Sequence, residues 1–414
     1  MSVLSGMVAG IDVHKGFLVV VVLDSNRPDE PLESRKFGTT FHALQELEAF
    51  FHRHGVKHVA MESTAQYWRP VWDALESRFE LKLAQARSTA APRGRKTDAS
   101  DALRIARRLL AGDLTLSYVP PPEQREWRLL SRECVAFREE IGRHRNRIEV
   151  LLEQAHLKLS CVVSDVLGVS GRRILRAMLN GETDPEQLSK LAHQKVRATK
   201  EELAEALRGN LKPAQKLTLR IHLDNIERLE SDIESMEKEL ASQQAEHQAT
   251  VERLSTIPGV GVRAAQQIIA EVGPKAEAFA AAGKLASWVG ACPGMHESGG
   301  VSMSSRAAKG NHYLRRLFCQ IAWAATLAKG SEAKRRYHKL KARLGPLKAI
   351  WAIAHYMVRV VWKVLSAGVP YRHDENPELS RRILLKRAAY LKRELARIGY
   401  LMNLTPADPA PLRS

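Results

Sequence analysis

Residues 96–110, KTDASDALRIARRLL, predict a helix that opens with two aspartates three positions apart. Asp98 and Asp101 lie on one face of such a helix, because positions i and i+3 are neighbours. Acidic residues suit the first turn of a helix, and Thr97 is a suitable N-cap residue. Helix capping is therefore the simplest explanation of the two aspartates, and the rest of the sequence decides whether they also have a second role.

Strand and helix patterns alternate through residues 1–122. The apolar, β-branched runs MVAGIDV and FLVVVVLD predict a hairpin of buried strands. Two further strands are predicted at KHVAMES and FELKLAQA, and two helices at FHALQELEAFFHRHG and WRPVWDALES. This alternation is typical of an α/β domain with a mostly buried sheet, and PPPE at 120–123 marks its end.

Two more acidic residues follow predicted strands. Asp12 lies in GIDVHKG and Glu62 in AMESTAQYW. Carboxylates at strand ends of an open α/β sheet converge at one edge, where they repel one another unless cations neutralise them. Mg²⁺ prefers carboxylate oxygens, and paired divalent ions promote phosphodiester cleavage. The pattern therefore predicts that Asp12, Glu62, Asp98 and Asp101 bind Mg²⁺, with Mn²⁺ as the alternative ion.

Residues 123–250 contain two long helices with coiled-coil spacing of apolar residues. Leu130, Phe137 and Ile148 belong to the first repeat, and Leu219 and Ile226 begin the second. The two helices form either an antiparallel hairpin within one chain or the seam of a dimer. The sequence between them predicts short helices joined by turns.

Basic residues are concentrated in the second half of the chain. The net charge is +18, and residues 301–363 contain fourteen Lys or Arg and one acid. This clustering favours a nucleic-acid partner. No apolar run is long enough for a transmembrane helix, and four widely spaced cysteines fit the reducing cytoplasm.

Residues 251–371 predict an all-α domain with two distinctive segments. LSTIPGVGVRAAQQIIAEVG predicts a helix-hairpin-helix in which Gly259 and Gly261 expose amides for a phosphate, or else a plain glycine turn. In the segment HESGGVSMSSRAAKGNHYLRR, a serine among cations is a candidate nucleophile, or else the segment is a flexible polar loop. Its serines are Ser298, Ser302, Ser304 and Ser305, and the basic residues predicted to bind nucleic acid are Arg306, Lys309, Arg315 and Arg316. A charged helix and tail complete the chain at 372–414.

The motifs GIDVHK, MESTAQYW and KTDASDA, taken in order, resemble the D-E-D-D signature of the transposases of the IS-one-ten insertion-sequence family. The resemblance extends from about residue 7 to residue 371. It implies an RNase H-like (RuvC-like) N-terminal domain in which the four acids bind metal. It also implies a C-terminal transposase domain whose essential serine matches Ser298, the serine of ESGG, which precedes KGNHYLRR; Ser302, Ser304 and Ser305 are the alternatives. Many relatives have Ser before the lysine of GIDVHK, so His14 is either a variant group beside the acids or without a role.

The resemblance implies a transposase that cuts and rejoins DNA at element ends and target. It further implies a structured noncoding guide RNA, a composite site from two subunits, and a tetramer of two dimers. Two alternatives remain. A metal-dependent Holliday-junction resolvase needs the acids but no serine, and a non-catalytic nucleic-acid-binding scaffold needs neither.

Overall fold

The computed structural model describes residues 4–63, 65–86, 97–294, 296–298, 301–304, 307–372, 385, 388–389 and 391–397. The chain divides into two compact units, Met1–Pro121 and Pro122–Ser414. Within the described residues, no helix combines the length and apolar character needed to cross a bilayer. The charged helix predicted near the C-terminus lies largely outside the described residues, although 391–397 are helical.

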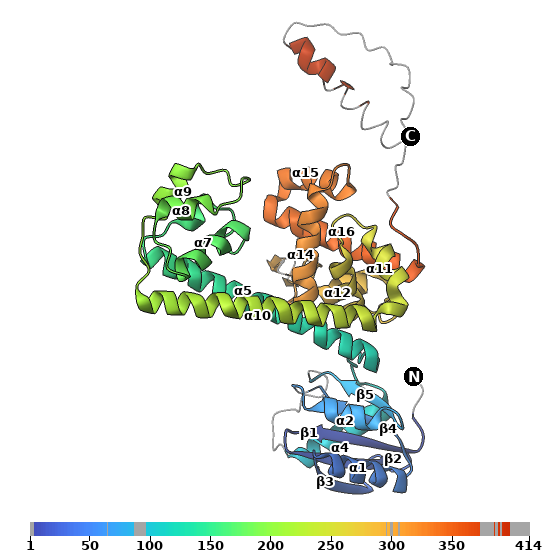
Figure 1. The fold of residues 1–414 in the computed structure, drawn as a ribbon. Helices are drawn as coiled ribbons and strands as arrows, with labels where there is room; N and C mark the ends of the chain where they lie inside the picture. The colour runs from blue at the N-terminus through green and yellow to red at the C-terminus, as the bar shows by residue number, and fades with distance from the viewer. Residues whose placement is uncertain are drawn as a thin grey trace. The chain divides into compact units, whose positions relative to one another are not determined.

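The first unit is built on a five-stranded mixed sheet of order β3-β2-β1-β4-β5 (Figure 1). β1 and β2 form the predicted antiparallel hairpin, β3 continues it, and β4 and β5 run parallel to β1. The strands are β1 Met7–Val13, β2 Phe17–Asp24, β3 Glu33–Gly38, β4 Val56–Glu62 and β5 Glu80–Ala84. Four of the five were predicted. β3 was missed because it is an exposed edge strand with one buried residue, Phe37, and so lacks an apolar run.

Helices cover both faces of this sheet. α1 (Phe41–Arg53) and α2 (Trp68–Leu75) pack on one face through a core that includes Phe50, Phe51 and Leu75. α4 (Asp98–Ala111) packs on the other face through Ala102, Ile105 and neighbouring apolar residues. The predicted α/β domain with a buried sheet is confirmed.

The position of α4 depends on Gly10 in β1. A Cβ atom added to Gly10 would lie 2.2 Å from the backbone oxygen of Ala102 and 2.6 Å from the backbone nitrogen of Ala106. These are backbone atoms of α4 and cannot rotate away. The missing side chain therefore lets the helix lie directly against β1.

We expect Gly10→Ala to destabilise the protein by about 1–3 kcal/mol, the usual cost of overpacking a core. The matched control is Gly16→Ala, because a Cβ at Gly16 meets nothing within 4 Å. Urea unfolding followed by circular dichroism measures both. Equal midpoints for the two variants would show that α4 does not need this close approach.

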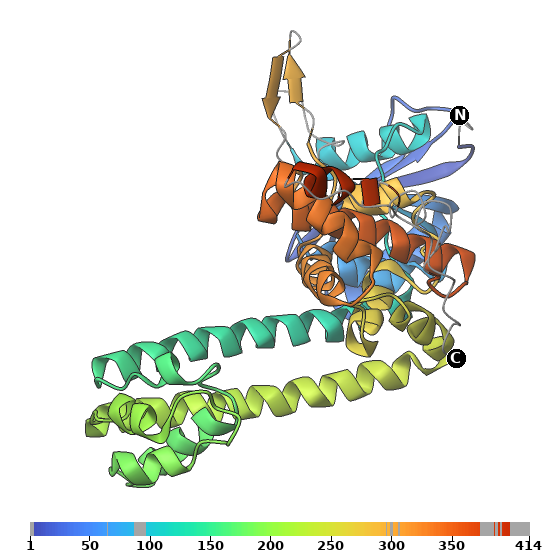
Figure 2. The same ribbon diagram turned by 90° about the horizontal axis from the view of Figure 1, so that it is seen from above.

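The second unit begins with a pair of long antiparallel helices, α5 (Pro122–Gln154) and α10 (Pro213–Gln243). They lie side by side along their length in Figures 1 and 2. The two coiled-coil repeats therefore form a hairpin within one chain. Ile148 of α5 and Leu223 of α10 meet in one core, whereas Trp127 and Leu240 share another. The hairpin thus connects two separate hydrophobic cores.

Short helices surround the first of these cores, as predicted for the segment between the long helices. They are α6 Leu159–Val162, α7 Val169–Leu179, α8 Pro185–Lys190 and α9 Lys200–Ala206. A short 3-10 helix, η1 Ala245–His247, follows α10. The helices that add to the second core are α11 Gln248–Ser255, α12 Val262–Val272, α13 Ala282–Val289, α14 His312–Leu327, α15 Glu332–Leu344 and α16 Pro346–Ala367. One departure from the all-α prediction is a two-stranded hairpin, β6 (His296–Ser298) and β7 (Val301–Ser304).

Candidate active site

Two of the four predicted acids lie on neighbouring strands at the same level. Ile11 pairs with Met61 in the parallel register of β1 and β4. The next residue on each strand is an acid, Asp12 on β1 and Glu62 on β4, and both are half-buried. Ala60 packs in the core beneath α4, and side chains alternate along a strand, so Glu62 faces α4 as well.

The other two acids come from the first turn of α4. Thr97 is the N-cap residue, and its side chain accepts a hydrogen bond from the backbone N–H of Ser100. The Ser100 hydroxyl in turn accepts one from the Thr97 N–H, which completes a capping box. Because these two residues cap the helix, capping does not require Asp98 or Asp101. The simplest explanation is correct for Thr97 and leaves the aspartates for another role.

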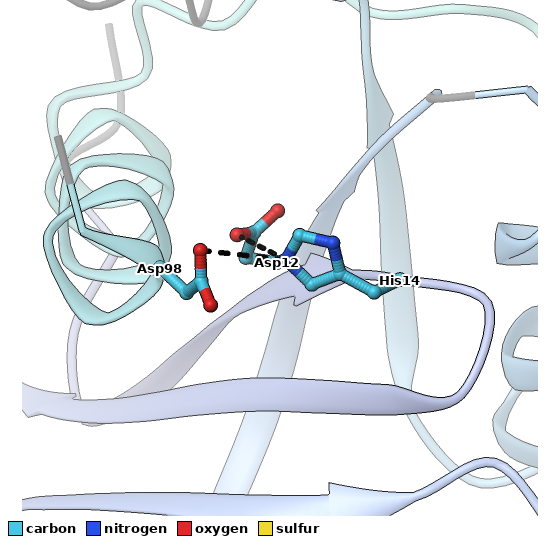
Figure 3. A group of neighbouring side chains, drawn as sticks. All are labelled: Asp12, His14 and Asp98. Carbon is cyan, nitrogen blue, oxygen red and sulfur yellow. Dashed lines mark hydrogen bonds and ion pairs between the residues drawn. The ribbon is translucent and has the colours of Figure 1, made fainter.

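Asp12, His14 and Asp98 converge at the end of β1 (Figure 3). The Nε2 atom of His14 lies 3.1 Å from Oδ2 of Asp12 and 3.6 Å from Oδ1 of Asp98. One potential ligand atom from each residue lies within 4.8 Å of the other two. Asp12 is 16% exposed and Asp98 is 51% exposed, so the cluster opens to solvent on the side of the helix.

The electrostatics of the cluster fit a divalent cation. Burial raises the pKa of Asp12, the neighbouring His14 lowers it, and the negative charges of Asp101 and Asp98 raise it again. Asp101 is buried and accepts a hydrogen bond from Arg104 at 2.5 Å. Several carboxylates thus approach one another around Asp12, which gives a donor set of the kind that hard cations prefer.

His14 is the residue of this cluster that the sequence left undecided. It lies in the turn between β1 and β2, where its backbone N–H donates to the carbonyl of Phe17 at 3.0 Å. Its ring stacks on that of Phe17, with centroids 4.5 Å apart. The sequence drew attention to His14 only because many relatives of the resembled family have Ser at this position.

Ser298 lies far along the chain, on β6. β6 and β7 pair antiparallel, with Ser298 opposite Val301 and Glu297 opposite Ser302. Figure 2 shows the hairpin extending away from the helices of the second unit. The side chains of Ser298, Ser302 and Ser304 lie outside the described structure, as do Ser305 and Arg306 altogether. The structure thus places the backbone of Ser298 in a hairpin and leaves its role as nucleophile a prediction.

The two chain segments that flank this hairpin lie close together because each has a glycine at the point of closest approach. Gly290 and Gly310 both have positive φ angles, and a Cβ on Gly310 would lie 2.4 Å from the backbone nitrogen of Gly290. The backbone N–H of Asn311 donates to the carbonyl of Trp288 at 2.8 Å. The segment that contains Ser298 therefore starts and ends at one narrow, well-fixed base.

A buried carboxylate fixes the same base to two helices. Glu271 of α12 is fully buried and accepts two hydrogen bonds from Arg132 of α5, at 2.7 and 2.9 Å. It also accepts one from Nδ2 of Asn311 at 2.9 Å. Asn311 caps α14 by accepting a hydrogen bond from the Leu314 N–H. Breaking a buried, hydrogen-bonded ion pair of this kind is costly, so the helix after the hairpin has a defined position.

Three of the basic residues predicted to contact nucleic acid lie within the described structure. Lys309 is exposed at the base of the β6–β7 hairpin. Arg315 donates to the carbonyl of Ala308 and lies over the Trp351 ring, whereas Arg316 pairs with Glu139 of α5 at 2.7 Å. Both arginines thus make contacts within the protein. Whether they also contact nucleic acid stays a prediction.

The predicted order of helix, tight turn and helix around PGVG is confirmed as α11, a turn and α12, and phosphate binding by a helix-hairpin-helix stays a prediction. Gly259 has φ +86°, and a Cβ there would lie 2.6 Å from the carbonyl oxygen of Ile321 in α14. A glycine at position 259 is therefore needed for the turn to pack closely against α14. Gly261 is the N-cap residue of α12, and a Cβ there would meet nothing within 4 Å. Packing therefore requires glycine at position 259 and leaves room for a side chain at position 261.

The predicted acids lie at the ends of β1 and β4 of a mixed five-stranded sheet and in the first turn of α4. Two family models identify the chain that carries them as a DNA transposase. A family model of the DEDD transposases of IS110 elements, described as "Transposase", matches residues 9–157. A second model, "Transposase IS116/IS110/IS902 family", matches residues 251–338. The chain belongs to the IS110 family of transposases.

Among solved structures, the chain is similar to RuvC of T. thermophilus in complex with a Holliday junction substrate. The two are 16% identical, and the match covers 27% of this chain and 99% of that chain with a TM-score of 0.21. A search of curated proteins returned no match.

Proposed function

We propose that this transposase cuts and rejoins the DNA strands of its insertion sequence with a metal-binding acidic site and Ser298 as the nucleophile. The observation that supports the proposal best is the convergence of Asp12, on the first strand of the first unit, with Asp98, at the start of α4. Glu62 lies on the adjacent strand at the level of Asp12, and Asp101 is near enough to influence its pKa. We therefore assign metal binding to these four acids.

The acids would hold Mg²⁺, with Mn²⁺ as the alternative. When bound, the ion would neutralise charge on the scissile phosphate. The carboxylates would orient that phosphate at the open side of the cluster, where Asp98 is exposed. Arg104 holds the carboxylate of Asp101 in place through their hydrogen bond.

The hydroxyl of Ser298 would lose its proton and form a bond to phosphorus while the bond from phosphorus to the leaving deoxyribose oxygen breaks, and that oxygen would take up a proton. The hydroxyl of an exchanged strand would then lose its proton and attack the serine–DNA phosphodiester, which rejoins the DNA, and the released serine oxygen would regain a proton. The fixed base of the hairpin supports this role, because a nucleophile on a positioned segment reacts faster than one on a free loop.

DNA binding follows from the transposase family, and we extend it to a structured guide RNA encoded by the element. Residues 301–363 supply a net charge of +13 that would bind the backbone of either nucleic acid, while base pairing would supply selectivity. Two long helices separate Ser298 from the acids along the chain. We therefore propose a composite site from two subunits, in a dimer or a tetramer of two dimers.

The experiment is cleavage of DNA that contains both element ends, with and without RNA transcribed from the noncoding flank of the gene. We expect cut strands only when RNA and a divalent ion are both present. Cutting of four-way junctions without RNA would instead favour the resolvase. No cutting in any reaction, together with tight binding, would favour the non-catalytic scaffold.

A further inference from the structure

We infer that His14 supplies a nitrogen ligand to the divalent ion held by Asp12 and Asp98, and that this ligand raises the affinity of the site for Mn²⁺ relative to Mg²⁺. The inference deepens the proposed function, since it rests on the acids being metal ligands. It adds to them a residue that lies outside the four-acid signature.

The spacing of the three side chains supports this assignment. Neighbouring ligands of an octahedral ion lie about 3 Å apart when each is about 2.1 Å from the metal. Nε2 of His14 is 3.1 Å from Oδ2 of Asp12 and 3.6 Å from Oδ1 of Asp98. A single ion can therefore contact all three atoms after small side-chain rotations. Figure 3 shows the imidazole directed toward both carboxylates.

The imidazole is also held in this orientation by its surroundings. The turn between β1 and β2 is closed by the hydrogen bond from the His14 N–H to the Phe17 carbonyl. The ring stacks on Phe17 at an interplanar angle of 28°. Phe17 is itself covered by Lys36, whose Nζ lies 3.7 Å from the Phe17 ring centroid. A ring oriented in advance loses little rotational freedom when it binds an ion.

The chemical types of the ligand atoms decide which ion the site binds more tightly. Imidazole nitrogen binds first-row transition ions better than it binds Mg²⁺, which prefers carboxylate oxygen and water. A site of oxygen ligands alone would discriminate less between the two ions. The nitrogen of His14 therefore raises affinity for Mn²⁺ relative to Mg²⁺.

The test is electron paramagnetic resonance of the full chain with Mn²⁺, read by electron spin echo envelope modulation. We expect a ¹⁴N modulation from directly bound nitrogen in the original protein and its loss in His14→Ser. The control is His42→Ser, because His42 on α1 is 82% exposed and carries no assigned role. We also expect His14→Ser to weaken Mn²⁺ binding about tenfold or more, and Mg²⁺ binding by much less.

Absence of ¹⁴N modulation in the original protein with Mn²⁺ bound would overturn the inference, as would an unchanged Mn²⁺ to Mg²⁺ affinity ratio in His14→Ser. Asp12→Asn separates this failure from failure of the proposed function. If Asp12→Asn abolishes Mn²⁺ binding while His14→Ser leaves it intact, the acids bind metal and only the role of His14 is wrong. If Asp12→Asn leaves Mn²⁺ binding intact, both proposals are wrong.

Discussion

We expect Asp12→Asn to lower the rate of strand cleavage about a thousandfold or more while the protein stays folded. The size of the effect follows from the several kcal/mol of charge stabilisation that a bound ion contributes to phosphoryl chemistry. Asn keeps the shape of the side chain and an oxygen that can accept the hydrogen bond of His14. It removes the negative charge that we assign to metal binding.

The same variant should be at least as stable as the original protein at neutral pH in the presence of a chelator. Burial and the charges of Asp101 and Asp98 raise the pKa of Asp12, so its ionised form destabilises the folded state. This destabilisation is fully present above the folded-state pKa. It disappears as pH falls below the carboxyl's ordinary pKa, where the folded and unfolded states are both protonated. The stability advantage of Asp12→Asn should therefore be seen at pH 7 and vanish in acid.

Thermal unfolding in chelator at a series of pH values measures the stability difference, and cleavage of element-end DNA measures the activity. Added Mg²⁺ or Mn²⁺ should raise the unfolding temperature of the original protein and leave that of Asp12→Asn nearly unchanged. A variant that is less stable at pH 7 and still cuts DNA would show that Asp12 is a structural residue and not a metal ligand.

Ser298→Ala should also abolish cleavage of element ends, by at least about a thousandfold, because no other hydroxyl would be held at the attacking position. Metal binding should be unaffected, since the acids lie in the first unit and Ser298 in the second. This combination, intact metal binding without cleavage, distinguishes a serine transposase from a resolvase, in which the acids suffice.

The matched controls for Ser298→Ala are Ser302→Ala and Ser304→Ala on the facing strand. Both belong to the same hairpin, so they test whether the loss is specific to one hydroxyl. We expect each to retain most of the cleavage rate, measured on radiolabelled element-end DNA. If Ser302→Ala or Ser304→Ala loses activity while Ser298→Ala keeps it, the nucleophile has been assigned to the wrong strand of the hairpin.

The fold could be predicted from sequence where burial leaves a regular pattern. β1 and β2 are nearly continuous apolar runs, β4 has a buried apolar centre at Val59–Met61, and α4 has helical spacing. β3 has no such pattern, because an edge strand that faces solvent can be built from polar residues. The arrangement of α5 and α10 was also open, because the same coiled-coil spacing serves a hairpin within one chain and a dimer between two.

The site was predictable where residue type and strand position together point to chemistry, as at Asp12. His14 could not be resolved, because a histidine in a turn has no spacing that distinguishes a ligand from a solvated side chain. The base of the β6–β7 hairpin could not be predicted either. It depends on the close approach of Gly290 and Gly310 and on the contact of Glu271 with Asn311, and both bring together residues that are distant in sequence.

We propose that the acids and Ser298 act on one phosphate. The decisive experiment is to incubate the protein with element-end DNA, RNA and Mn²⁺, denature the mixture, digest it with trypsin and identify DNA-linked peptides by mass spectrometry. We expect a nucleotide attached to the peptide that contains Ser298, and none with Asp12→Asn. Cut DNA without any linked peptide, or a link at another residue, would show that Ser298 is not the nucleophile.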